Sequence, residues 1–362
     1  MDTSDPDISF NDQGVCNHCT KFMIRLSERG YVRGESELLW KQYLEVIKAS
    51  GKGKPYDCVV GISGGVDSCY VAYLCKEFGL RALLIHLDNG WDTEIAVNNI
   101  KSVVKTLGFD YVSYVIDWEE FREIQLAFLK SSSVDLEMTT DIAILASIYD
   151  TAAKHNIRYI ISGGNLASEG ILPIRWGYHS YKDMKMYKAI VRKYSNVPLR
   201  KVPTIGLLKE SYYRFFLKMK TLYILDYVDF DKDVAKSFLS NNVGWKDYGG
   251  KHHESKITAF WQGFVMYDKF NMDYRRSTFA SQICKGQISR QDALEQLKGT
   301  PFDPEKISED KKYVAKKFRI GSDELDSYLA LPPKTYVDFP NNKRVLDLCY
   351  DAYRKYFNQK RV

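Results

Sequence analysis

The sequence predicts an α/β protein built on a doubly wound, mostly parallel sheet, followed by a mainly helical carboxyl-terminal region. Strand and helix patterns alternate from about residue 55 to residue 162, which is typical of parallel sheets covered by helices. Three polar clusters that contain glycine or asparagine come directly after three of the strand patterns. Since ligands bind at the carboxyl ends of the strands in such sheets, we expect one ligand site there.

The predicted elements of the α/β part follow one another in order. Short apolar runs indicate buried strands, and the longer runs between them indicate helices. The expected strands are 56–62, 81–87, 111–116 and 157–162, and the expected helices are 68–78, 93–107, 118–129 and 139–154.

After Pro198 the pattern changes and becomes mainly helical. Residues 205–220 and 231–242 predict helices, and residues 221–230 between them predict a strand that returns to the sheet. Residues 289–298 predict a short capped helix that serves as scaffold. A longer amphipathic helix is indicated by apolar residues at i, i+3, i+4, i+7 and i+8, namely Ile257, Phe260, Trp261, Phe264 and Val265.

The length of 362 residues corresponds to roughly two domains. Hydrophobic residues make up 45% and charged residues 27% of the chain, so the apolar surface suffices for sizeable cores. We expect three segments: 1–50, which contains a C-x-x-C and a helix; 51–205, the α/β domain; and 206–362, a mainly helical region that binds a substrate or a partner.

Composition and charge exclude several classes of protein. The net charge of +6 is small for this length, and a solvated surface explains the lysine-rich runs at least as well as nucleic acid does. No apolar run approaches the length of a membrane span, and the acidic first residues do not resemble a signal peptide. The seven scattered cysteines do not form a secreted disulfide framework. We therefore expect a cytoplasmic protein that binds neither nucleic acid nor a membrane.

The first polar cluster, S-G-G-V-D-S at residues 63–68, lies between a strand and the start of a helix. Adjacent glycines permit close approach of backbone N–H groups to an anion, and the helix start adds free N–H groups and a positive dipole end. The loop lacks the lysine of G-x-x-x-x-G-K-[ST] and does not match G-x-G-x-x-G. For the glycines alone, a plain turn before a helix is the better interpretation.

The complete string S-G-G-x-D-S after a strand is more specific. It resembles the pyrophosphate loop of the ATP-pyrophosphatase (N-type, PP-loop) superfamily, whose members cleave ATP to AMP and pyrophosphate while they adenylate a substrate. The resemblance implies adenylation rather than kinase chemistry, with Asp67 beside a bound Mg²⁺. It also implies that the pyrophosphate portion of ATP is bound by Ser63, Gly64, Gly65, Val66, Asp67 and Ser68.

The other two clusters fit the same picture. The resemblance places the adenosine at H-L-D-N-G-W, at the end of the second strand, where a polar turn is the alternative interpretation and is equally good for His86 alone. S-G-G-N-L-A-S-E-G follows a later strand and would complete the phosphate site, with Glu169 as a ligand of Mg²⁺ or of the acceptor. The candidate residues are His86, Asp88 and Asn89 in the first, and Gly163, Gly164, Asn165 and Glu169 in the second.

Several motifs spread over essentially the whole chain resemble one family much more closely. SDPDISFNDQGVCNHC, ISGGNLASEG, LDYVDF, NNVGWKDYGGKHHESKITAFWQGF and ICKGQISRQDALEQL, in this order, are similar to the N-acetyl sugar amidotransferase family. The resemblance implies that the acetamido oxygen of a nucleotide-activated N-acetyl sugar attacks the α-phosphate of ATP. Ammonia then displaces AMP and leaves an acetamidino group.

The same resemblance implies partners and a biological setting. Family members receive ammonia from a glutaminase subunit paired with a cyclase-like barrel subunit, and their products are amidino sugars of lipopolysaccharide O-antigens and related surface glycans. No cysteine nucleophile or glutaminase triad is evident in this sequence, which agrees with imported ammonia.

Two groups of residues in the carboxyl-terminal region are further candidates for the site. The first precedes the amphipathic helix and offers a cation, two imidazoles that can bind oxygens or accept a proton, and a carboxylate, although a helix cap is the alternative. The second offers two guanidinium groups for a sugar carboxylate or phosphates, and a surface ion pair is an equally good interpretation. The first group is Lys251, His252, His253 and Glu254, and the second is Arg275 and Arg276.

Cys16 and Cys19 form a C-x-x-C, which is the spacing of half a structural zinc site, whereas two free thiols are the alternative. Family members usually carry a second C-x-x-C directly upstream of a segment like M-D-T-S-D-P-D-I, with which this sequence begins. Either the sequence begins late, or the zinc site is absent or is completed by other residues. The candidates are His18, His252, His253 and Cys284.

Two other functions are compatible with the loop. An adenylating tRNA-modifying enzyme of the thiolation type requires an RNA-binding surface and reactive cysteines, and the modest charge and the lack of an RNA-binding motif count against it. A regulator that binds ATP without catalysis is the second alternative. Pyrophosphate release on addition of a sugar would exclude it.

Overall fold

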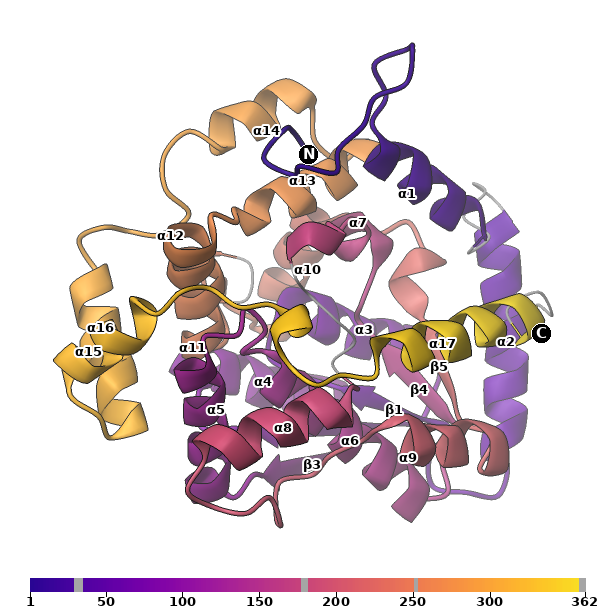
Figure 1. The fold of residues 1–362 in the computed structure, drawn as a ribbon. Coiled ribbons are helices and arrows are strands. Elements are labelled where there is room, and N and C mark those ends of the chain that lie inside the picture. Colours follow the sequence, from indigo (N-terminus) through magenta and orange to yellow (C-terminus); the bar gives the residue numbers. More distant parts are fainter. Residues whose placement is uncertain (29–34, 177–181, 251–252, 358–362) are drawn as a thin grey trace.

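The computed structural model describes residues 1–28, 35–176, 182–250 and 253–357. At its centre lies a five-stranded sheet of order β3-β2-β1-β4-β5, in which every neighbouring pair is parallel (Figure 1). The strands are β1 Cys58–Gly61, β2 Ala82–Asp88, β3 Asp110–Val115, β4 Tyr159–Ser162 and β5 Lys220–Tyr223. This order confirms the predicted doubly wound sheet.

Helices cover both faces of the sheet because successive strand residues point to opposite sides. Val59 and Leu83 belong to one core, and Cys58 and Val60 belong to the other. The first core is closed by α5 (Trp118–Ser131), α6 (Met138–Lys154) and α8 (Met184–Tyr194). The second is closed by α2 (Glu35–Gly51), α3 (Val66–Glu77), α4 (Glu94–Leu107) and α10 (Lys232–Val243).

The remaining helices lie around the carboxyl edge of the sheet and along the surface (Figure 1). The α-helices are α1 Asn17–Glu28, α7 Leu166–Glu169, α9 Leu207–Ser211, α11 Lys256–Thr258, α12 Met266–Phe270, α13 Tyr274–Cys284, α14 Arg290–Gln296, α15 Ile307–Phe318, α16 Ser322–Leu329 and α17 Lys343–Phe357. π-helical turns span Tyr212–Phe216 and Ala259–Val265, and 3₁₀ turns span Ile174–Trp176, Ile224–Asp226 and Tyr336–Asp338.

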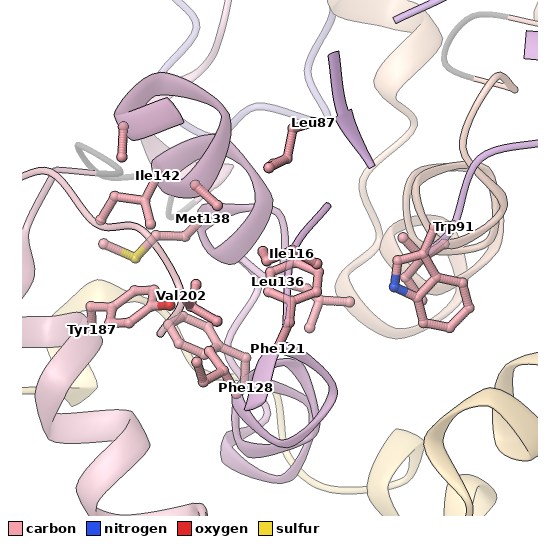
Figure 2. Close-up of a cluster of buried hydrophobic side chains, with 14 of the residues drawn as sticks. Leu87, Trp91, Ile116, Phe121, Phe128, Leu136, Met138, Ile142, Tyr187 and Val202 are labelled. Carbon is pink, nitrogen blue, oxygen red and sulfur yellow. The ribbon is translucent and has the colours of Figure 1, made fainter. Parts of the chain in front are cut away.

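Figure 2 shows part of the first core, where Met138 and Ile142 of α6 pack on the same side of their helix. Phe128 of α5 and Tyr187 of α8 meet beneath them with ring centroids 5.5 Å apart. All four side chains are at most 1% exposed. The start of α6 is therefore held firmly on its apolar side, which leaves its other faces to polar groups.

The eight elements predicted between residues 56 and 162 are confirmed, and their ends differ from the structure by at most two residues. In the carboxyl-terminal region the predicted returning strand is confirmed as β5, which joins the sheet beside β4 and is shorter than expected. The helix predicted over 205–220 is α9 followed by a π-helical turn. The amphipathic helix is a continuous run from α11 through a π-helical turn to α12, with Ile257 and Trp261 each 1% exposed.

The strand order creates a switch point between β1 and β4. The chain runs from β1 outward through β2 to β3, and then returns to the other side of β1 as β4. The loops that leave β1 and β4 therefore diverge over opposite faces, and a ligand crevice forms between them at the carboxyl ends. Within the parts of the chain described above, no helix is both long and apolar enough to cross a bilayer.

Candidate functional site

The loop after β1 has the backbone geometry that an anion site requires. Gly64 has φ +81°, and a Cβ there would lie 2.4 Å from the carbonyl oxygen of Ala96 in α4. Gly65 is the extended N-cap residue of the twelve-residue helix α3, with no side-chain cap bond. The two glycines thus let the loop pass against α4 and present the N-terminus of α3 to the crevice.

The two serines of the loop hold its backbone in shape. The Ser63 N–H donates to Ser68 Oγ at 3.1 Å, and the Gly65 N–H donates to Ser63 Oγ at 3.3 Å. Ser68 Oγ in turn donates to the Gly65 carbonyl at 3.1 Å. The hydroxyls therefore form a local network, and the loop is preorganised without a ligand.

Two residues that the sequence analysis did not single out hold the outer side of the loop. The carbonyl of Gly64 accepts hydrogen bonds from Trp245 Nε1 at 2.9 Å and from Asn99 Nδ2 at 3.2 Å. Asn99 also accepts from the Lys246 N–H at 2.8 Å. Trp245 lies in one of the motifs that carried the family resemblance, so the sequence could have indicated it as a site residue. No pattern in the sequence indicated Asn99.

The mouth of the loop is lined by Tyr248 and Glu254 from the carboxyl-terminal region. Tyr248 Oη accepts a hydrogen bond from the Val66 N–H at 3.2 Å. Measured from the place of a Cβ on Gly65, Glu254 Oε1 lies at 3.1 Å and Tyr248 Oη at 3.2 Å. Burial, together with the charges of Glu254 and Asp67, raises the pKa of Tyr248, so its hydroxyl stays protonated.

Glu254 reaches this position because its segment pairs with the loop after β2. The Thr93 N–H donates to the Glu254 carbonyl, and the Lys256 N–H donates to the Trp91 carbonyl, both at 2.9 Å. Between them Asp92 and Ser255 form an antiparallel bridge. The backbone therefore joins the second and the carboxyl-terminal candidate clusters over the pyrophosphate loop.

His86 anchors the loop after β2. Its Nδ1 lies 2.9 Å from the Ile62 carbonyl oxygen and its Nε2 lies 3.0 Å from Asp92 Oδ2, so both nitrogens face acceptors. Burial disfavours the charged ring, but the hydrogen bond and charge of Asp92, with smaller contributions from Ile62 and Asp88, raise the pKa of His86. The side chains of Asp88 and Asn89 accept N–H groups within the same turn.

We expect the pair of His86 with Asp92 to stabilise the fold only where the ring is protonated. A histidine whose pKa is raised on folding contributes fully below about pH 6.5, and the contribution is lost as the pH rises through the folded-state pKa. Urea unfolding of the wild type and of His86→Gln should therefore show a larger difference in free energy at about pH 5.5 than at about pH 8.5. A difference that does not change with pH would mean that the ring is neutral.

The loop after β4 meets the pyrophosphate loop, as predicted. Asn165 Nδ2 donates to Asp67 Oδ2 at 3.2 Å, and Asn165 Oδ1 caps α7 by accepting the Ser168 N–H at 3.0 Å. A Cβ on Gly163 would lie 3.2 Å from the Ser68 nitrogen, so this glycine permits close approach of the two loops. Gly164 packs against the Tyr223 ring, and Glu169 is exposed at the end of α7.

The remaining candidates are distributed differently. Lys251 and His252 lie outside the described residues. His253 is exposed, and its Nδ1 accepts the Gly250 N–H at 3.2 Å in a turn. Arg275 binds Asp273 at 2.7 Å and the carbonyls of Gln296 and Gly299, and Arg276 pairs with Asp2. These contacts give both arginines a scaffold role, and their substrate role stays a prediction.

The C-x-x-C lies beside Cys284, one of the candidates for completing a zinc site, and zinc binding there stays a prediction. Cys16 Sγ and Cys19 Sγ are 3.3 Å apart, and a hydrogen bond with Cys284 and burial raise the pKa of Cys19. His18 is engaged by Asp5 at 2.5 Å. Apart from the stretches around residues 31, 179, 251 and 360 that are not described, the chain holds no group of three or more His, Cys, Asp or Glu placed to bind a metal ion.

The fold and loop define a class that the family comparisons match. Residues 39–169 match the NAD synthase family, and residues 254–355 match the family "LPS biosynthesis protein WbpG-like, C-terminal domain". The chain thus joins an ATP-pyrophosphatase domain of the NAD synthase type to a domain of lipopolysaccharide biosynthesis proteins. Both matches agree with the predicted resemblance to the N-acetyl sugar amidotransferase family.

Comparison with curated proteins gives no match. Among solved structures, an NMN synthetase from Francisella tularensis is 16% identical, with 79% of this chain and 97% of that chain covered and a TM-score of 0.35. An NH3-dependent NAD synthetase from Campylobacter jejuni is 16% identical, with 83% and 98% covered and a TM-score of 0.32. With scores this low, neither structure contributes to the assignment.

Proposed function

We propose that this protein is an AMP-forming amidotransferase that adenylates the acetamido oxygen of a nucleotide-linked N-acetyl sugar and replaces that oxygen with ammonia. The observation that carries the proposal is the position of Glu254. This residue opens the stretch that matches the lipopolysaccharide-biosynthesis domain, and its carboxylate lies beside Gly65 of the pyrophosphate loop. The pyrophosphate loop therefore lies beside a residue of the lipopolysaccharide-biosynthesis domain, which supports one site for ATP and sugar.

In this mechanism the N-terminus of α3 and the glycines bind the pyrophosphate portion of ATP, which becomes the leaving group. Asp67 would hold the Mg²⁺ that neutralises the phosphates, because Mg²⁺ sites use one or two carboxylates and take further ligands from phosphate and water. We assign the adenosine to the turn of His86, Asp88 and Asn89. We assign Glu254 and His253 to the acceptor, and the same role, which the family resemblance implies for Lys251 and His252, stays a prediction.

An amide is a poor electrophile, so adenylation is needed to convert its oxygen into a leaving group. The rest of the catalysis is positioning and exclusion of water from the activated imidate. We further propose that a glutaminase subunit with a barrel-shaped partner supplies the ammonia. A thiolation reaction is not favoured, because Cys69, which follows the loop directly, is fully buried and burial raises its pKa.

An assay with ammonium chloride, ATP, Mg²⁺ and a panel of nucleotide-linked diacetamido sugars tests the proposal. We expect AMP only when a suitable sugar is present, and a product in which one oxygen is replaced by NH. The Asp67→Asn protein, which keeps the size of the side chain but not its charge, should form no AMP. AMP that appears with tRNA rather than with a sugar would contradict the proposal.

A further inference from the structure

Acidic residues gather at the start of α6, beside the proposed site. Asp135 is 5% exposed and accepts the Met138 N–H at 3.2 Å. Glu137 Oε2 accepts a hydrogen bond from Thr258 Oγ1 at 3.0 Å, whereas Glu137 Oε1 is buried without a hydrogen-bond partner among the described residues. Asp141 lies one helical turn further along, at the exposed rim.

Carboxyl groups from other elements act electrostatically on the same residues. The charge of Glu254 acts on Glu137 from the start of α11, and Glu169 acts from the end of α7 on the Tyr274 hydroxyl of α13. Burial, and then the charges of four of these carboxyl groups, raise the pKa of Tyr274. We call this set the acidic cluster; it comprises Asp135, Glu137, Asp141, Glu169, Glu254 and Tyr274.

Two buried hydroxyl groups beside the cluster point to a ligand. Thr140 is 7% exposed and Thr278 is 9% exposed, and the Oγ1 of each has no hydrogen-bond partner among the described residues. Thr140 lies three positions after Glu137, and Thr278 lies four positions after Tyr274, so each shares a helix face with a member of the cluster. Buried hydroxyls are nearly always bonded, so these two are available to a polar ligand.

A series of contacts connects the acidic cluster to the pyrophosphate loop. Glu137 is bonded to Thr258, whose Oγ1 lies 3.0 Å from Ser255 Oγ. Ser255 follows Glu254, whose carboxylate lies at the mouth of the loop beside Gly65. Figure 2 shows the side chains of Met138 and Ile142 in the core, and Glu137 and Asp141 directly precede these two residues in the sequence.

We propose that the acidic cluster binds ammonium and that Glu137 takes its proton, so that ammonia is released beside the adenylated sugar. The inference rests on the proposed function. Buried carboxyl groups of like charge stay protonated unless a cation compensates their charge, so a bound cation would allow them to ionise. The described residues of the cluster do not have the arrangement that binds a metal ion. Ammonium is a cation with four N–H donors, which suit the free oxygens of Glu137, Thr140 and Thr278.

Each proton that ammonium loses has an acceptor, and the pKa of Glu137 suits the first transfer. One proton of ammonium passes to the Glu137 carboxylate, and the free lone pair forms the C–N bond with the protonated imidate carbon. The C–O bond breaks with its electron pair on AMP, and the second excess proton passes from the nitrogen to the phosphate of the departing AMP as the amidinium forms. Burial and repulsion by Asp141 raise the pKa of Glu137 to about 8, which makes it a much stronger base than an ordinary carboxylate.

The test compares Glu137→Gln with the wild type at a fixed pH. We expect the KM for ammonium to rise about 10-fold or more, while the KM for ATP changes little. Hydroxylamine, which is largely unprotonated at neutral pH, should still serve as nucleophile. Glu119→Gln is the matched control, because Glu119 is exposed on α5 and pairs with Arg319 away from the cluster. An unchanged KM for ammonium in Glu137→Gln would overturn the inference.

A binding measurement separates this inference from the proposed function. Ammonium chloride should raise the melting temperature of the wild type relative to sodium chloride, and this difference should be lost in Glu137→Gln but not in Glu119→Gln. Ammonium-specific stabilisation without sugar-dependent AMP would contradict only the proposed function. Sugar-dependent AMP without ammonium-specific stabilisation, and with equal KM values, would contradict only the assignment of Glu137.

Discussion

Gly65→Ala is expected to reduce ATP-dependent AMP formation by about 100-fold or more, which corresponds to about 2.7 kcal/mol of transition-state stabilisation. The backbone of Gly65 has φ −71°, which alanine adopts without strain. The added methyl group would lie 3.1–3.2 Å from Glu254, Ser63 and Tyr248, and it would occupy the mouth of α3 where the phosphates enter. Steady-state AMP formation and the KM for ATP measure the effect.

Gly64→Ala is the contrasting control for this prediction. Gly64 has φ +81°, and a Cβ added at this position would lie 2.4 Å from the backbone oxygen of Ala96, which cannot move aside. A left-handed alanine costs about 1–2 kcal/mol, and overpacking adds about 1–3 kcal/mol, so this variant should lose stability. Gly65→Ala should instead unfold in urea nearly as the wild type does. Wild-type turnover in Gly65→Ala would show that ATP binds elsewhere.

The second large effect is a fall in the free energy of unfolding as the pH rises from about 4.5 to about 8. Burial and the charge of Asp141 raise the pKa of both Asp135 and Glu137 to about 8. Between about pH 4.5 and about pH 8 the folded state therefore keeps protons that the unfolded state has already released. The free energy of unfolding falls as the pH rises through this interval. Each group should lower stability by about 1.4 kcal/mol for each pH unit within the interval.

Urea unfolding at several pH values measures this dependence. The pair of His86 with Asp92 also contributes less stability as the pH rises. The pH dependence of the wild type alone therefore does not isolate the contribution of the acidic cluster. The difference in pH dependence between Glu137→Gln and the wild type isolates the contribution of Glu137, because the amide does not titrate. We expect the variant to lose less stability than the wild type between about pH 5.5 and about pH 8. Parallel curves would mean that Glu137 ionises normally.

A large part of the fold could be predicted because its signals are local. A buried strand, a glycine turn and a helix start are contiguous in the chain, so the sequence predicted β1, the loop and α3 together. The meeting of Asp67 with Asn165 also followed, because parallel strands bring their carboxyl ends to one edge of the sheet. A ligand site that is formed by one turn and the strand before it can therefore be predicted from the sequence.

The groups around the loop depend on long-range pairing, and no local pattern reports it. Glu254 was a candidate from the family resemblance, but only the bridge between Asp92 and Ser255 places its carboxylate beside Gly65. Tyr248 was not predicted, because a tyrosine in a loop has many ordinary roles. Arg275 was expected at the substrate and is engaged by Asp273 and three backbone carbonyls. These carbonyls belong to a turn more than twenty residues away in the sequence, so no local pattern reports the contact.

The sequence by itself determined the class of this protein: a parallel sheet, an ATP-pyrophosphatase loop and a carboxyl-terminal region of the sugar amidotransferase type. The sheet follows from periodicity and turn residues, and the other two follow from motifs that resemble known families, all of which are properties of short segments. Only the tertiary structure decided which polar groups share a buried environment. The acidic cluster comes from α6 and the residues before it, α7, α13 and the residues before α11. Its raised pKa values arise from burial and mutual repulsion, which exist only after these elements pack together.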